Sequence, residues 1–272
     1  MPRLGVLGWP VAHSRSPAIH NAAFAALDMA DWRYQRLPVP PELFAQTTRS
    51  LRACGFIGAN VTIPHKRAAL ALADRSSEAA SAIGAANTLS FDPEGAISAE
   101  NTDAPGLIAA LGQSPAGMRA LVLGAGGSAR AAVWALREAG ASEVSVWNRT
   151  RTRAEALARD LGVRAVGAPE RADLLINCTS VGLEGGVDEV EALSQLGLTS
   201  ERVGEYAYVV DMVYGSGSTP LLTAAERHGV RTLDGLEILL AQGALSFELW
   251  THRAAPIKDM RRALRDGAQS GI

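Results

Sequence analysis

The sequence predicts an α/β fold that is built from parallel β-α units. Two observations support this prediction. Strand and helix patterns alternate from the N-terminus onward, and a second alternating run begins near residue 118. With 272 residues, of which 47% are hydrophobic, the chain can form one large domain or two modest ones, with a sizeable core in either case.

The first run begins with an apolar, β-compatible segment at 3–7. A helix is expected at 16–27, where Pro17 suits the first turn and Ser16 is a candidate for the N-cap. The remaining elements expected in this run are a strand at 32–37, a helix at 41–53, a strand at 56–63, and a hairpin formed by 85–91 and 95–100.

The second run begins with a strand at 119–124 and a helix at 127–140. The elements expected after these are strands at 143–148, 172–178 and 208–214, and helices at 152–162, 236–250 and 256–266. Residues 183–205 are interpreted as a loop that could hold a short helix, because this segment contains Gly185, Gly186, Gly197 and Gly204.

Charge and cysteine content exclude several classes of function. The formal net charge is −2, so the chain lacks the basic surface of a nucleic-acid-binding protein. Cys54 and Cys178 are too few for a disulfide framework or a thiolate metal site, and the five histidines lack ligand spacing. We therefore expect a reducing, cytoplasmic location, no structural metal and no nucleic-acid partner.

No signal peptide or membrane span is expected. Pro10 breaks the N-terminal apolar stretch, and no cleavage pattern follows it. A membrane span needs about 18 or more uninterrupted apolar residues, and 235–250 comes closest. Glu237, Gln242 and Glu248 interrupt that segment, which predicts a long and mostly buried helix rather than a contact with a membrane.

A dinucleotide-binding turn is predicted at GAGGSA, residues 124–129, between a strand and a helix. Gly124 allows the tight turn, Gly126 lets a pyrophosphate approach the backbone, and Ala129 permits close packing of helix on strand. The N–H groups at the start of the helix would then face the phosphates. The alternative is a glycine-rich turn that binds no ligand.

The end of the next strand favours NADP over NAD. An NAD-binding domain usually carries a carboxylate there, which holds the ribose 2′-hydroxyl. This sequence instead has Asn148, Arg149 and Thr150, followed by Arg151 and Arg153, and these side chains can donate hydrogen bonds to a 2′-phosphate. Arg151 could equally be an ordinary surface residue.

Polar residues gather at five places in otherwise apolar surroundings. Asn60 and Thr62 alternate with apolar residues along one strand, so they share a face, and Lys66 follows once Pro64 has ended the strand. The other four groups are Ser14-Arg15-Ser16-Pro17, Asn87-Thr88, Asn101-Thr102-Asp103 and Gln242. Each taken singly has a structural alternative, such as a helix cap, a turn residue or a core amide.

Taken together, these segments form motifs that resemble shikimate dehydrogenases over almost the whole chain. The motifs, in order, are GVLGWPVAHSRSPAIHN, GANVTIPHK, GAANT, NTD, GAGGSAR, NRT, DMVYGSGSTPLL and GLEILLAQGALSFELWT. The resemblance implies two α/β domains around a cleft. Residues 1–102 and 236–272 would bind the substrate, and residues 103–235 would form a Rossmann-like NADP-binding domain.

The resemblance also implies an activity and roles for single residues. The reaction would be the reversible, NADPH-dependent reduction of 3-dehydroshikimate to shikimate, a step of aromatic amino-acid biosynthesis. Ser14 and Ser16 would bind the substrate carboxylate, with Tyr214 assisting. The implied contacts to the ring hydroxyls are Asn60, Thr62, Asn87, Asp103 and Gln242. The implied cofactor contacts are Gly124, Ala125, Gly126, Gly127, Ser128, Ala129, Asn148, Arg149, Thr150, Arg153, Met212 and Gly235.

Lys66 would be the catalytic group, with Asp103 beside it. Ketone reduction needs a proton donor near the carbonyl oxygen, and serine and threonine hydroxyls are poor acids. No histidine matches a site motif, and His65 is interpreted as structural. Two alternatives stay open: a dehydrogenase of quinate or a related cyclitol acid, and a non-catalytic NADP-binding regulator. Intact Lys66 and Asp103 argue against the regulator, and either a monomer or a homodimer suits the size.

The sequence departs from the family pattern at three places. CTSVG at 178–182 stands where the family commonly has a run of the type Asn-Ala-Thr or Asn-Thr-Thr. Asp234 stands before Gly235, where Asn is common. His252 replaces the glycine that usually follows the final Trp-Thr. None of these changes removes a proposed catalytic group.

Overall fold

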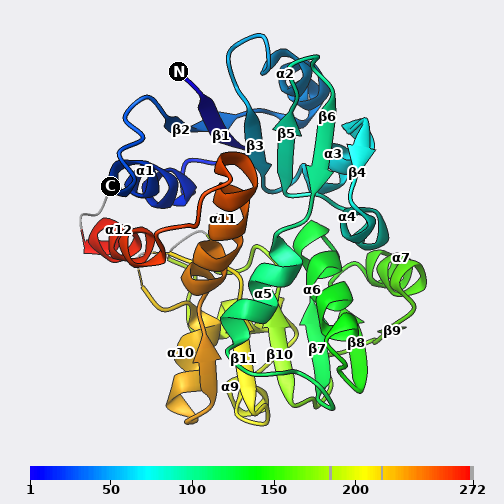
Figure 1. Cartoon of the computed structure of the whole chain (residues 1–272). Coiled ribbons are helices and arrows are strands. Elements are labelled where there is room, and N and C mark those ends of the chain that lie inside the picture. The colour runs from blue at the N-terminus through cyan, green and yellow to red at the C-terminus, as the bar shows by residue number, and fades with distance from the viewer. Residues whose placement is uncertain (184–185, 216, 270–272) are drawn as a thin grey trace. The chain divides into compact units, whose positions relative to one another are not determined.

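The computed structural model describes residues 1–183, 186–215 and 217–269. The chain divides into two compact units, one made of Met1–Gly106 with Leu239–Ile272 and the other of Leu107–Ile238. Each unit is built on a six-stranded sheet with helices, which confirms the predicted α/β fold class (Figure 1). The boundaries of the units lie a few residues after the predicted 103 and 236, so Asp103 belongs to the first unit.

The sheet of the first unit has the order β2-β1-β3-β5-β6-β4. Its strands are β1 (Arg3–Gly8), β2 (Arg33–Pro38), β3 (Gly58–Val61), β4 (Arg75–Ser76), β5 (Thr88–Phe91) and β6 (Ile97–Glu100). Only β5 runs antiparallel to its neighbours, and its pairing with β6 confirms the predicted hairpin. The strand expected at 56–63 is shorter than predicted, because Phe56 forms only an isolated bridge with Arg3.

The helices of this unit differ in part from the prediction. They are α1 (Ser16–Ala26), the 3₁₀ helix η1 (Pro41–Leu43), α2 (Phe44–Ser50), α3 (Lys66–Leu72), α4 (Glu78–Ile83) and α12 (Ile257–Gln269), together with α5 (Asp103–Leu111) and α11 (Gly235–Thr251), which each have residues in both units. The expected helix at 41–53 is divided into η1 and α2, and no helix was expected at the positions of α3, α4 and α5. Ser16 is not the N-cap of α1, since Arg15 holds that position and no side chain caps the helix.

Two groups of buried side chains stabilise the first unit. Phe44, Leu51 and Ala69 from the helices and Leu89 and Ile97 from the strands belong to one cluster. A second group is aromatic: the His20 ring stacks on the Tyr34 ring with centroids 4.2 Å apart, and Phe247 and Trp250 of α11 flank it. The predicted burial of the long helix near the C-terminus is therefore confirmed, since Phe247 has no exposed surface.

The second unit has a fully parallel sheet of order β12-β11-β10-β7-β8-β9. Its strands are β7 (Arg119–Leu123), β8 (Glu143–Trp147), β9 (Arg164–Ala165), β10 (Leu174–Asn177), β11 (Tyr208–Asp211) and β12 (Arg231–Leu233). This is the doubly wound order of Rossmann folds, in which the strand order reverses between β7 and β10. The carboxyl ends of these two strands are therefore where a ligand is expected.

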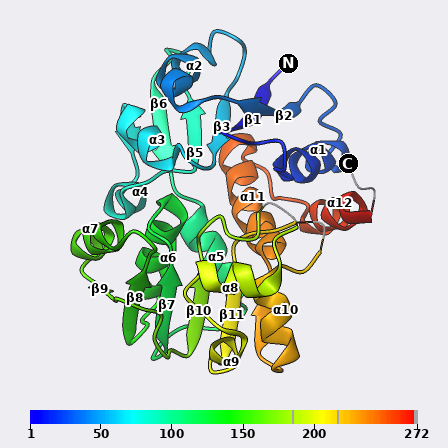
Figure 2. The same ribbon diagram turned by 180° about the vertical axis from the view of Figure 1, so that it is seen from behind.

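Helices cover both faces of this sheet. They are α6 (Gly127–Glu138), α7 (Arg151–Leu161), α8 (Glu189–Gln195), α9 (Ser200–Val203) and α10 (Pro220–Arg227). One buried cluster joins the strands to α5, α6 and α7, and another joins them to α8, α9 and α10. Figure 1 shows α5 and α6 in front of the sheet, and Figure 2, from behind, shows α8 in front of it. Parallel strands covered on both faces are the usual arrangement in α/β domains.

The segment interpreted as a loop contains two of these helices. Asp188 caps α8, since its side chain accepts hydrogen bonds from the N–H groups of Val190 and Glu191. Thr199 caps α9 in the same way through the N–H of Arg202. The segment at 183–205, interpreted as a loop that could hold a short helix, therefore contains two short helices, while Glu184 and Gly185 lie outside the described residues.

Candidate active site

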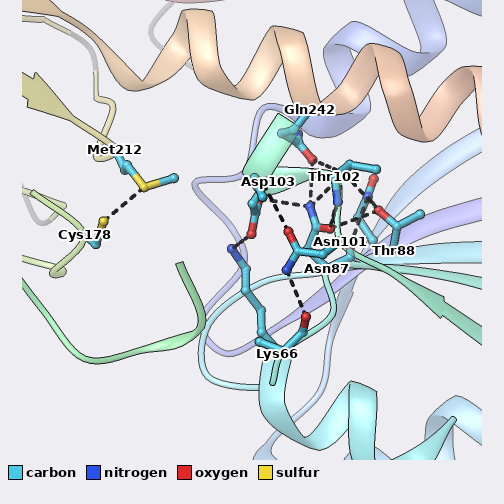
Figure 3. A network of polar contacts seen from close by, with 12 residues as sticks. Lys66, Asn87, Thr88, Asn101, Thr102, Asp103, Cys178, Met212 and Gln242 are labelled. Carbon is cyan, nitrogen blue, oxygen red and sulfur yellow. Dashed lines mark hydrogen bonds and ion pairs between the residues drawn. The ribbon is translucent and has the colours of Figure 1, made fainter. Parts of the chain in front are cut away.

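An ion pair between two helix starts is the centre of the site. Lys66 is the first residue of α3, and Asp103 is the first residue of α5. The Lys66 Nζ lies 2.6 Å from Oδ2 of Asp103, and the two side chains are 12% and 7% exposed (Figure 3). A short, charge-assisted bond of this kind holds the ammonium in a defined place while leaving part of it accessible.

Asn87 joins this pair to its surroundings. Its side chain lies just before β5 and donates to Oδ1 of Asp103 and to the hydroxyl of Thr102, both at 2.9 Å. The same Nδ2 lies 3.2 Å from Oε1 of Gln242, while the Asn87 Oδ1 accepts from the N–H of Thr102 at 2.7 Å. The structure therefore brings together four of the predicted site residues: Lys66, Asn87, Asp103 and Gln242.

The position of Gln242 depends on a glycine in the neighbouring helix. A Cβ on Gly106 of α5 would lie 2.8 Å from both the Cβ and the backbone nitrogen of Gln242 in α11. Only a residue without a side chain allows this approach, because real Cβ atoms do not come so close to other heavy atoms. Gly106 thus lets α11 place the Gln242 amide beside Asn87.

A cluster of buried hydroxyl groups lies next to Asn87 and was not predicted to be part of the site. The Ser246 Oγ is 3.0 Å from the Thr88 Oγ1 and 3.1 Å from the Thr102 Oγ1. All three residues are buried. Helical spacing could have indicated Ser246, which lies four residues after Gln242 and therefore on the same face of α11.

Asn60 is held by the protein itself. Its Nδ2 donates to the Ser246 Oγ at 2.9 Å, and the Thr88 Oγ1 and the Asn87 carbonyl also lie within reach, at 3.1 and 3.2 Å. Its Oδ1 accepts from the Tyr34 hydroxyl at 2.7 Å. These contacts occupy both amide hydrogens, so Asn60 supports the cluster, and its predicted contact with a substrate hydroxyl stays a prediction.

The two serines lie together where the loop after β1 meets α1, with Ser14 in the loop and Ser16 as the first residue of the helix. The Ser14 hydroxyl is 3.3 Å from that of Ser16, and both residues are buried. The Arg36 Nε donates to the backbone carbonyl of Ser14 at 2.9 Å, which brings a guanidinium close to this loop. Thr62 is half-buried one residue after β3, and its methyl group packs against Gly8.

His65 is a core side chain, as predicted. Its ring stacks on Phe44 with centroids 4.4 Å apart, and its Nε2 lies 2.7 Å from the Val39 carbonyl. Burial lowers the pKa of His65 below its usual value, which favours the neutral ring. Lys66 is consequently the side chain next to Asp103 that can donate a proton.

The glycine-rich turn of the second unit fits a dinucleotide. Gly124 has φ of +113°, and a Cβ there would lie 3.1 Å from the Cys178 carbonyl carbon and oxygen, so the protein itself requires glycine. A Cβ on Gly126 would meet nothing within 4 Å, so packing alone does not require glycine there. The open space over Gly126, the N-cap of α6, suits a pyrophosphate against the helix N-terminus.

The expected 2′-phosphate contacts follow β8. Arg149 and Arg153 are exposed, and within the described residues neither has an ion-pair partner. Arg151 pairs with Glu155 at 2.7 Å on the surface of α7, in agreement with its interpretation as an ordinary surface residue. Asn148 donates to the Thr150 carbonyl at 2.9 Å, which shapes the turn between the strand and α7.

The remaining predicted contacts follow β10, β11 and β12. Met212 lies directly after β11, and its Sδ is 3.3 Å from the Cys178 Sγ after β10. A Cβ on Gly235 would lie 2.6 Å from the Met212 carbonyl oxygen, so glycine is required there. Tyr214 belongs to the same unit as Met212, whereas the other predicted substrate contacts belong to the first unit.

Asp234 performs the task expected of the more common asparagine. Its Oδ1 accepts hydrogen bonds from the N–H groups of Leu236 at 3.0 Å and Glu237 at 3.1 Å. These are free N–H groups at the start of α11, so Asp234 caps this helix. The departure from the family pattern therefore leaves the local structure of the turn unchanged.

The described part of the chain contains neither a candidate metal-binding group nor a helix that could span a membrane. No group of three or more His, Cys, Asp or Glu side chains there is arranged to hold a metal ion. Among the helices of that part, none combines the length and the apolar character that crossing a membrane would require.

Comparisons with known proteins agree along the chain. Residues 6–89 match the family described as "Shikimate dehydrogenase substrate binding domain". Residues 108–180 match "Shikimate / quinate 5-dehydrogenase", and residues 235–265 match "Shikimate 5'-dehydrogenase C-terminal domain". These three segments lie in the order in which the motifs were found.

Curated and solved relatives extend over nearly the full length. The shikimate dehydrogenase (NADP(+)) of Paracoccus denitrificans is 42% identical, over 97% of this chain and 95% of its own. A crystal structure of shikimate 5-dehydrogenase from Thermus thermophilus, in complex with NADP(H) and shikimate, is 43% identical with a TM-score of 0.86, covering 98% of this chain and 99% of its own.

The same fold also serves another substrate. The ligand-free 5-ketofructose reductase of a Gluconobacter strain is 30% identical with a TM-score of 0.80, covering 97% of this chain and 98% of its own. The higher identity to the shikimate enzymes and the three family matches agree with the motifs in the sequence. The chain therefore belongs to the shikimate dehydrogenase family.

Proposed function

We propose that this chain is an NADP-dependent oxidoreductase that reduces 3-dehydroshikimate to shikimate, reversibly, in aromatic amino-acid biosynthesis. Its membership of the family and the names of its relatives support the reaction. The single observation that carries the proposal is the Lys66–Asp103 pair at 2.6 Å, held by Asn87. A protein that only bound NADP would not need this pair.

Lys66 would donate the proton in the reduction. When bound, NADPH supplies a hydride to the carbonyl carbon. The Lys66 ammonium would give its proton to the carbonyl oxygen, and Asp103 would orient the ammonium and accept a hydrogen bond from the hydroxyl that forms. In the reverse direction, the neutral amine would take the hydroxyl proton back, so one residue serves both directions.

The first unit would bind the substrate, and the second would bind NADP. Ser14 and Ser16 would donate to the carboxylate, and Arg36 adds positive charge close to them. The ring hydroxyls would contact Asn60, Thr62, Asn87, Asp103 and Gln242. Asn87 and Gln242 are amides that both donate and accept, which suits hydroxyl groups. Tyr214 would assist at the carboxylate.

The cofactor would lie along the second unit. The backbone from Gly124 to Ala129 would hold the pyrophosphate at the start of α6. The 2′-phosphate would be bound by Asn148, Arg149, Thr150 and Arg153, because arginine donates charge-assisted bonds to phosphate oxygens. Met212 and Gly235 complete the set of proposed contacts. A carboxylate, which would repel that phosphate, is absent from residues 148–153.

The reaction is tested by following absorbance of the reduced nicotinamide with purified protein. Shikimate, quinate and a substrate-free control would each be supplied with NADP or with NAD. We expect the highest kcat/KM with shikimate and NADP, since two small serines beside the carboxylate suit the planar ring carbon of shikimate. A higher kcat/KM for quinate would favour the alternative dehydrogenase, and NADP binding without turnover would favour the regulator.

The cellular location and the oligomeric state of the enzyme are also proposals. Cys54 and Cys178 form no disulfide in the part of the chain that the structure describes, which suits the reducing cytoplasm. A monomer or a homodimer is proposed from the size of the chain. Sedimentation of the purified protein would distinguish the two.

A further inference from the structure

Asp211 is a buried carboxylate that the proposed reaction does not use. It is the last residue of β11, and it has no exposed surface. A charged group in such a position is costly unless hydrogen bonds compensate for the lost water. The contacts of the Asp211 carboxylate therefore indicate its role in the structure.

Three donors from three different segments meet at the Asp211 carboxylate. Oδ1 accepts from the Asn177 Nδ2 at 2.9 Å and from the backbone N–H of Val213 at 3.0 Å. Oδ2 accepts from the Thr219 hydroxyl at 2.7 Å. Thr219 is also the N-cap of α10, so Asp211 connects the end of β11 to the start of that helix.

Asn177 extends the network to the segment after β10. It is the last residue of β10, and its Oδ1 accepts from the backbone N–H of Thr179 at 3.0 Å and from the Thr179 hydroxyl at 2.7 Å. Thr179 in turn accepts from the N–H of Val181 at 3.1 Å. One carboxylate thus determines the path of the chain after two neighbouring strands.

One residue proposed to contact NADP, Met212, lies inside these segments. Met212 stands between Asp211 and Val213, and its Sδ approaches the Cys178 Sγ, as Figure 3 shows. Cys178 stands between Asn177 and Thr179, and its carbonyl group lies against Gly124 of the glycine-rich turn. Cys178, beside the turn, and Met212, which touches Cys178, are therefore each flanked by members of the Asp211 network.

The doubly wound order assigns these segments to one half of the dinucleotide. In such sheets the two nucleotide halves bind on opposite sides of the switch point, which here lies between β7 and β10. The 2′-phosphate contacts follow β8, so the adenosine half belongs to the β7–β8 side. The segments after β10 and β11 consequently face the nicotinamide half.

We propose that Asp211 is a positioning residue for the nicotinamide half of NADP, acting through Asn177, Val213 and Thr219. This inference rests on the proposed function. Asp211 touches neither substrate nor cofactor; it holds the backbone at Cys178 and Met212 in the shape that receives the nicotinamide. Burial raises the pKa of Asp211 to about 6, and its three hydrogen bonds oppose that rise, so the carboxylate is ionised at neutral pH.

Calorimetric titration of two ligands tests the proposal. NADPH carries both halves, whereas 2′,5′-ADP carries only the adenosine half with its 2′-phosphate. Asp211→Ala should raise the Kd for NADPH about 10-fold or more and leave the Kd for 2′,5′-ADP within about twofold. Asp211→Asn should restore most of the NADPH affinity, because its oxygen still accepts from Asn177 and Val213 and its amide can donate to the Thr219 hydroxyl.

A second pair of variants decides the matter if Asp211→Ala does not fold. Thr219→Val removes the hydroxyl and keeps the shape, while Thr219→Ser keeps the hydroxyl and is the matched control. We expect Thr219→Val to weaken the binding of NADPH but not that of 2′,5′-ADP. Thr219→Ser should bind both ligands as the wild type does. Unchanged NADPH affinity in Thr219→Val, or equal losses for both ligands, overturns the inference. Wild-type protein that binds neither ligand would instead overturn the proposed function.

Discussion

The Nζ of Lys66 and the Oδ2 of Asp103 lie 2.6 Å apart, at the first residues of two different helices. The second oxygen of the carboxylate is held by Asn87 at 2.9 Å, so Asp103 has a defined orientation. Both side chains are largely shielded from water. Removing one member of such a pair leaves the other with an uncompensated charge, which lowers the stability of the fold.

Replacing Lys66 by alanine should lower kcat by about 10²–10⁴-fold, the usual contribution of a positioned acid or base. KM should change less, because Ser14, Ser16, Asn87 and Gln242 would still bind the substrate. Steady-state kinetics with shikimate and NADP measure both parameters. Turnover close to that of the wild type would mean that Lys66 only begins a helix, and Asp103 would then be the next candidate for the catalytic role.

Replacing Arg149 by aspartate should weaken the binding of NADP far more than the binding of NAD. Loss of charge-assisted bonds to the 2′-phosphate corresponds to about 1.5–3 kcal/mol, or roughly 10- to 150-fold in affinity. Titration of both cofactors measures the change. Arg151→Asp is the matched control. Arg151 already pairs with Glu155, so this substitution should leave the preference for NADP over NAD nearly unchanged. An equal effect of the two substitutions would remove Arg149 from the proposed site.

His20 should make the protein less stable in acid. Burial lowers the pKa of His20 from 6.5 to about 3, against a smaller opposing effect of the Asn60 side chain, and within the described residues neither ring nitrogen has a partner in hydrogen-bond geometry. As the pH falls below 6.5, the unfolded chain binds a proton that the folded chain does not. The free energy of unfolding should therefore fall by up to about 1.4 kcal/mol per pH unit from this residue alone.

Comparison with His20→Phe isolates this contribution, because phenylalanine keeps the aromatic stack on Tyr34 and does not titrate. Urea unfolding between about pH 5 and pH 7 should show a shallower pH dependence in the variant, whatever its stability at neutral pH. Equal slopes in the two proteins would show that the His20 ring is not held in its neutral form.

His252 stands in a backbone conformation that favours glycine. Its φ is +54°, and its side chain is exposed. The Cβ of an L-residue is strained there, so His252→Gly should raise the free energy of unfolding by about 1 kcal/mol. Urea denaturation measures the change. His252→Ala is the control, since it removes the imidazole but keeps the Cβ; a similar gain in that variant would assign the effect to the ring.

Much of the second unit follows from its sequence alone. Strands 119–124 and 143–148 and the helix between them were predicted within one or two residues, because they are short-range patterns of apolar spacing and glycine. The glycine-rich turn was located for the same reason. The helix pattern was weaker at 183–205. The glycines there favoured a loop, so Asp188 and Thr199 were not identified as the N-caps of α8 and α9.

The motif residues of the candidate site could also be found in the sequence, but their geometry could not. Lys66 and Asp103 are 37 residues apart, and they meet because β3, β5 and β6 are neighbours in one sheet. Ser246, Thr88 and Asn60 form one cluster although Ser246 lies 186 residues from Asn60. Asp211 and Thr219 lie in the DMVYGSGSTPLL motif, but the motif does not show that the Asp211 carboxylate also meets Asn177 at the end of β10. Such contacts depend on strand order and on the return of α11 to the first unit, which are long-range features that no local pattern encodes.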